Sequence, residues 1–241
     1  MRSVHDFIHS ASHRLVSGII VHNEQDAEGM MGLARLMELF DAIDEEVVGC
    51  WNRRCNINHG YCEKLTAGKA LQIHHNLSRL QTSERFKGYD WFEWTKAGSH
   101  EAQTSHQGVG LRETQCADIF ITQKWLHNRL WVLCSTHGLL SPVSEHVELT
   151  LPYAIGIAND TLQICKSLRI SSMEAHGIGL VEKLFDIIIS ALDISSSLDP
   201  SLSQLPSLAA DYMLLLTSLR GGNHPFLERY KAYLASSLPA G

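Results

Sequence analysis

One group of side chains able to bind a metal ion consists of three cysteines and a histidine. Three residues separate Cys55 from His59, two separate His59 from Cys62, and four separate Cys50 from Cys55. Thiolate sulfur and imidazole nitrogen are ligands that zinc prefers. The spacing departs from the usual zinc patterns, however, and Cys50 falls at the end of a predicted helix. We therefore expect these thiols to pack as small apolar groups, and we expect no bound metal or cofactor.

Three further histidines follow one another at helical spacing near the N-terminus. His5, His9 and His13 lie four residues apart and share one face of a predicted helix. Neighbouring members are able to clasp a transition metal. All three cannot bind one ion, because their Cα atoms would span about 12 Å along a straight helix. A solvated, pH-sensitive histidine face is the expected role.

A thiol–imidazole pair, Cys134 and His137, lies on a later predicted helix that also carries His127. Such a pair can supply a nucleophile and its base. The helix is apolar on most sides, so packing is the expected role of these residues. His176 stands near a helix start, where it can cap the helix or act as a base, and capping is favoured. No dinucleotide, P-loop, nucleophile-elbow or metalloprotease motif occurs, and no catalytic residue is predicted.

Aromatic residues gather in the segment Tyr89–Trp94. Together with tryptophans of a later helix they can line an apolar ligand pocket. Alternatively, they fasten an irregular segment to the core. The candidate ligand-lining residues are Trp91, Trp94, Trp125, His127, Trp131, His137 and His176.

Helical periodicity dominates the elements that must position these groups. The clearest case is Ser171–Asp193, predicted as one helix that begins at the capping box Ser171-x-x-Glu174. Its apolar face consists of Val181, Leu184, Phe185, Ile188, Ile189 and Leu192. Further helices are predicted at 4–20, 33–47, 65–80, 113–137, 147–168, 208–219 and 225–238.

This pattern predicts an all-α fold, a multi-helix bundle or helical array of about eight helices. We expect a single domain covering residues 1–241. An irregular loop at about 81–112 and a Ser/Pro-rich connector at about 195–206 interrupt it.

Composition restricts the kinds of partner. The net charge is −6, and no run of basic residues is longer than Arg53-Arg54. Strong nucleic-acid binding by this chain alone is therefore not expected. Scattered cysteines and the lack of an apolar leader favour a reducing, intracellular compartment. No apolar run approaches the roughly 18 residues of a membrane span, so a soluble protein is expected.

Several segments resemble the regulatory region of fungal zinc-cluster transcription factors, which carry a binuclear six-cysteine DNA-binding module. The blocks are Ala117–Leu126 continuing through Ser135–Ser141, Met173–Gly177 with Glu182–Asp186, and Ala34–Asp41. The resemblance extends along roughly the whole chain. It implies a nuclear, dimeric regulator, often of a secondary-metabolite gene cluster, in which this domain restrains or transmits activation.

The DNA-binding cluster of that family has a C-x2-C-x6-C pattern, which Cys50, Cys55 and Cys62 do not match. We therefore expect this chain to lack the DNA-binding module. One hypothesis is a transcription-regulator domain that works through protein contacts or metabolite sensing. The alternatives are a repurposed helical scaffold that binds or converts a hydrophobic small molecule, and a purely structural partner subunit.

Overall fold

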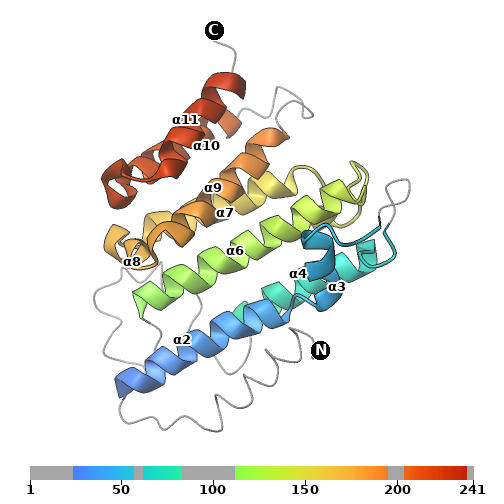
Figure 1. The fold of residues 1–241 in the computed structure, drawn as a ribbon, viewed down its shortest axis with the longest axis horizontal. Coiled ribbons are helices and arrows are strands. Elements are labelled where there is room, and N and C mark those ends of the chain that lie inside the picture. The colour runs from blue at the N-terminus through green and yellow to red at the C-terminus, as the bar shows by residue number, and fades with distance from the viewer. Residues whose placement is uncertain (1–23, 57–61, 83–111, 195–203, 238–241) are drawn as a thin grey trace. The chain divides into compact units, whose positions relative to one another are not determined.

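The computed structural model describes residues 24–56, 62–82, 112–194 and 204–237 (Figure 1). Within these ranges the regular elements are α-helices and short 3-10 turns, and no strand is present. The predicted all-α fold is confirmed. His5, His9, His13, His59 and the segment 89–94 lie outside the described residues, as does nearly all of the predicted loop at 81–112.

The chain divides into two compact units. The first consists of residues 1–119 and 133–139, and the second of residues 120–132 and 140–241. Helix α6 (Glu113–Thr136) contributes its two ends to the first unit and its middle to the second. Each unit is described by itself, and the single domain expected for residues 1–241 stays a prediction.

The first unit contains α2 (Glu24–Asp41), α3 (Glu45–Trp51) and α4 (Ala67–Thr82). The helix predicted at 33–47 is in fact two helices, because Asp44 caps the second one. Its carboxylate Oδ1 accepts a hydrogen bond from the backbone N–H of Val47 at 2.9 Å, which satisfies a donor that would otherwise have no partner in the helix. Leu33 and Phe40 of α2 are both exposed.

The second unit is built around α9 (Gly177–Asp193). This helix packs against α7 (Tyr153–Ser167), α8 (Ile170–Glu174), α10 (Gln204–Ser218) and α11 (Pro225–Ser237). A short 3-10 turn, η3 (Val147–Leu149), precedes α7, and another, η5 (Leu219–Gly222), follows α10. Because α9 has neighbours on several sides, most of its predicted apolar face lies in the core: Val181, Leu184, Phe185, Ile188 and Leu192 are buried. Ile189 of that face is only half-buried, whereas Ile187, which the prediction did not include, is fully buried.

The prediction of one helix over Ser171–Asp193 is wrong at a single point. Gly177 adopts a left-handed backbone with φ of +63°, and this divides the segment into α8 and α9. The N-cap of α8 is Arg169, so Ser171 and Glu174 lie inside that helix and do not form the predicted capping box. The carboxylate of Glu174 accepts a hydrogen bond from the backbone N–H of Arg220 at 2.6 Å instead.

Candidate metal centre and an open groove

Four potential metal ligands of the first unit converge on one point. The ligand atoms of Cys50, Cys55, Cys62 and His137 all lie within 4.8 Å of one another. Cys50 Sγ lies 3.8 Å from Cys62 Sγ, and Cys55 Sγ lies 3.4 Å from His137 Nε2. Cys50, Cys62 and His137 are each 2 % exposed, whereas Cys55 is half-buried. All six cysteines of the chain are free thiols.

The end of α3 positions the first two ligands. Arg53 has a left-handed backbone with φ of 55°, its N–H donates to the carbonyl of Cys50, and the N–H of Arg54 donates to that of Gly49. This pair of hydrogen bonds is a Schellman motif, which reverses the chain directly after the helix. Cys50 in the last turn and Cys55 after the reversal are thereby brought to the same place.

A second motif of the same kind positions the histidine. His137 is the C-cap of α6, and Gly138 follows it with φ of 66°. The N–H of Leu139 donates to the carbonyl of Cys134, and the N–H of Gly138 donates to that of Ser135. The cluster therefore forms where two helices end.

The hydrogen bonds of His137 determine its tautomer. Its Nδ1 lies 2.8 Å from the carbonyl oxygen of Leu133, and a carbonyl can only accept. Nδ1 therefore carries the proton, and Nε2 presents its lone pair toward Cys55. Metal-binding histidines are commonly held in this way, with the second ring nitrogen donating to a backbone carbonyl.

The two buried thiols of Cys50 and Cys62 differ in their readiness to ionise. Burial, together with hydrogen bonding to Cys55 and Cys62, raises the pKa of Cys50 to about 12. Burial also opposes ionisation of Cys62, but backbone N–H groups of Leu65 and Lys64 donate to its sulfur, and its pKa is lowered overall. Cys62 therefore ionises more readily than Cys50.

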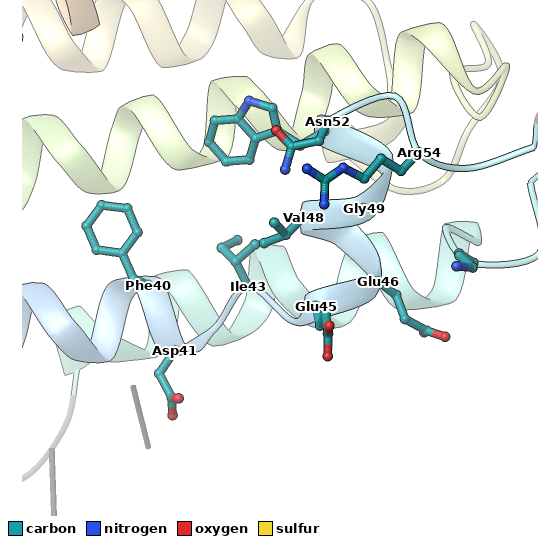
Figure 2. Close-up of a pocket in the computed structure, with 11 residues that line it drawn as sticks. Phe40, Asp41, Ile43, Glu45, Glu46, Val48, Gly49, Asn52 and Arg54 are labelled. Atoms are coloured by element: carbon teal, nitrogen blue, oxygen red, sulfur yellow. The ribbon is translucent and has the colours of Figure 1, made fainter. Parts of the chain in front are cut away.

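An open groove of about 520 Å³ lies beside this cluster on α2 and α3. Figure 2 shows Phe40, Ile43 and Val48 between an acidic border and the side that carries Asn52 and Arg54. The full lining is Phe40, Asp41, Ile43, Glu45, Glu46, Val48, Gly49, Trp51, Asn52, Arg54 and Lys64. The groove thus combines an apolar floor with an acidic border and a basic one.

The predicted ligand-lining residues of the second unit are engaged in packing and internal hydrogen bonds. The indole N–H of Trp125 donates to Asp186 at 3.0 Å, and that of Trp131 donates to the carbonyl of Thr150 at 2.8 Å. His127 is 5 % exposed, and its Nδ1 lies 3.4 Å from the hydroxyl of Tyr153. These contacts favour a structural role, while Trp91 and Trp94 lie outside the described residues.

The other candidates from the sequence, Cys134, His137 and His176, do not form one site. His137 turns its Nε2 to Cys55, and burial raises the pKa of Cys134 to about 12, so that thiol is not activated as a nucleophile. His176 occupies the N-cap position of α9, but its side chain makes no capping hydrogen bond. Sequence reasoning did not connect His137 with the early cysteines, because no local pattern relates residues so far apart.

Comparison with known proteins found no matching family model, no matching curated protein and no matching solved structure. The resemblance to zinc-cluster transcription factors therefore stays a prediction. Among the described helices, none is both long and apolar enough to cross a membrane.

Proposed function

We propose that this chain is a helical regulatory domain of a transcription-control protein, acting in the nucleus by binding a partner protein in the α2–α3 groove. The observation that carries the proposal is the exposed apolar surface of this groove. Phe40 is 37 % exposed, and Leu33, two turns earlier on the same face of α2, is 42 % exposed. Apolar side chains that remain in contact with water beside a groove are typical of a protein-binding surface. The segments that resemble the regulatory region of zinc-cluster factors fall mainly on α2, α6, α8 and α9, which supports the same function.

The borders of the groove indicate the chemistry of the partner. Asp41, Glu45 and Glu46 lie along one border, where Lys69 pairs with Glu46, and Arg54 and Lys64 supply positive charge elsewhere. An amphipathic helix with an apolar face and a row of lysine or arginine residues facing the acidic border matches this pattern. Apolar anchors of such a helix would enter the groove, and the charges would fix its direction.

The proposal is tested by fusing the full chain to an unrelated DNA-binding domain and measuring transcription of a reporter gene. We expect the fusion to change transcription several-fold. Phe40→Ser and Glu45→Lys should each abolish most of this change, because they remove an apolar anchor and reverse a border charge.

Matched controls lie in the second unit. Leu214 is 70 % exposed on α10, and Glu182 is exposed on α9. Leu214→Ser and Glu182→Lys should leave the reporter response unchanged. An inactive wild-type fusion, or equal losses in the groove variants and the controls, would contradict the proposal.

A further inference from the structure

We propose that Cys50, Cys55, Cys62 and His137 bind one structural Zn²⁺ ion per chain. The proposal concerns the first unit alone and does not depend on the function proposed above. It replaces the sequence-based hypothesis that the three early thiols serve only in packing.

The distances among the ligand atoms match those of a zinc tetrahedron. With Zn–S bonds of about 2.3 Å and Zn–N bonds of about 2.0 Å, two sulfurs lie about 3.8 Å apart, and a sulfur and a nitrogen about 3.5 Å apart. The corresponding distances here are 3.8 Å for Cys50 and Cys62, and 3.4 Å for Cys55 and His137. The widest separation in the set is within 4.8 Å, so side-chain shifts of about 1 Å complete the tetrahedron.

The surroundings of the ligands are also those of a metal site. The Nδ1 proton of His137 is held by the carbonyl of Leu133, which leaves Nε2 free to coordinate. Backbone N–H groups donate to the sulfur of Cys62, as they would to a metal-bound thiolate. On binding, Zn²⁺ displaces the thiol protons to solvent.

The composition of the set favours zinc in a structural role. Three thiolates and one imidazole in a tetrahedron are typical of Zn²⁺, and four protein ligands leave no open position for substrate. The ion would join the end of α3 and the segment before α4 to the end of α6. It would thereby link parts of the chain that are far apart in sequence, since Cys55 and His137 are 82 residues apart. It would also hold the chain from Cys50 to Cys55, which carries Trp51, Asn52 and Arg54 of the groove.

The first test is elemental analysis and native mass spectrometry of the full wild-type chain, purified without chelator. We expect one Zn²⁺ per chain, and we expect the half-buried thiol of Cys55 to resist alkylation until the zinc is removed by a chelator. Cys62→Ser should lose the ion. Cys165→Ser is the matched control, because Cys165 is equally buried at 2 % but lies in α7 of the second unit, and this variant should keep the zinc.

The second test assigns the ligands without depending on a destabilised variant. The zinc is exchanged for Co²⁺, whose absorption should show the bands of a tetrahedral site with sulfur-to-metal charge transfer. His137→Cys should retain the ion and shift these bands as a fourth thiolate replaces the imidazole, whereas His137→Ala should bind far more weakly.

Three outcomes would overturn the proposal. The wild-type chain could be folded yet contain no stoichiometric metal, with Cys55 open to alkylation in the absence of chelator. It could hold a disulfide between Cys50 and Cys62 in place of an ion. Finally, iron could occupy the site of the protein purified from its source, which would refute the assignment to zinc.

Discussion

Burial of His74 predicts that the free energy of unfolding of this protein depends on pH. This histidine lies on α4 and is 1 % exposed, and burial lowers its pKa from 6.5 to about 4. Between these two values the unfolded chain binds a proton that the folded chain does not. The free energy of unfolding therefore decreases as the pH falls through this range. Linkage gives a loss of about 2 kcal/mol between pH 7 and pH 5, approaching about 3.4 kcal/mol below pH 4.

The assay is urea denaturation followed by far-UV circular dichroism at pH 7 and pH 5. His74→Gln removes the titrating group and keeps a polar side chain of similar size. Between pH 7 and pH 5, the free energy of unfolding of this variant should therefore fall by about 2 kcal/mol less than that of the wild type. His75→Gln is the matched control, because His75 is exposed on the same helix, and it should behave as the wild type. Protonation of carboxylates and release of metal affect all three chains alike and cancel in the comparison. Equal losses in the wild type and His74→Gln would refute the reasoning.

Three further substitutions test the packing and the backbone. For each one, the measurement is the free energy of unfolding, determined by urea denaturation. Leu184→Ala should cost about 2–5 kcal/mol because Leu184 is 0 % exposed, whereas Leu214→Ala at a 70 % exposed site should change stability by less than about 0.5 kcal/mol. Tyr212→Phe should cost about 1 kcal/mol, since it deletes the 2.9 Å hydrogen bond to the carbonyl of Ala158, and a cost near zero would contradict that role. Arg53→Gly should raise stability by about 0.5–1 kcal/mol by relieving the left-handed backbone, and a loss would show that no strain resides there.

The helices were largely predictable because helical periodicity is a local property. The helix predicted at 65–80 is α4, Ala67–Thr82, and the one predicted at 113–137 is α6, Glu113–Thr136. Two errors lie where a single residue ends a helix: Asp44 caps α3 inside an unbroken apolar pattern, and Gly177 turns the chain at φ of +63°. A third is the helix predicted at 147–168, which is the 3-10 turn η3 followed by α7, whose N-cap is Pro152. Periodicity averages over several turns, so it is insensitive to such a local change of backbone.

The sequence by itself determined where most of the helices lie and which side chains of α9 face the core, with Ile189 as the exception, because both depend on neighbours within a few turns. It also supplied the three early thiols, but at spacings that local rules do not assign to a metal. Only the tertiary structure decided their partner, since His137 reaches them through the end of α6, 82 residues beyond Cys55. Side chains so distant in sequence meet only when helices pack, and packing depends on the whole chain.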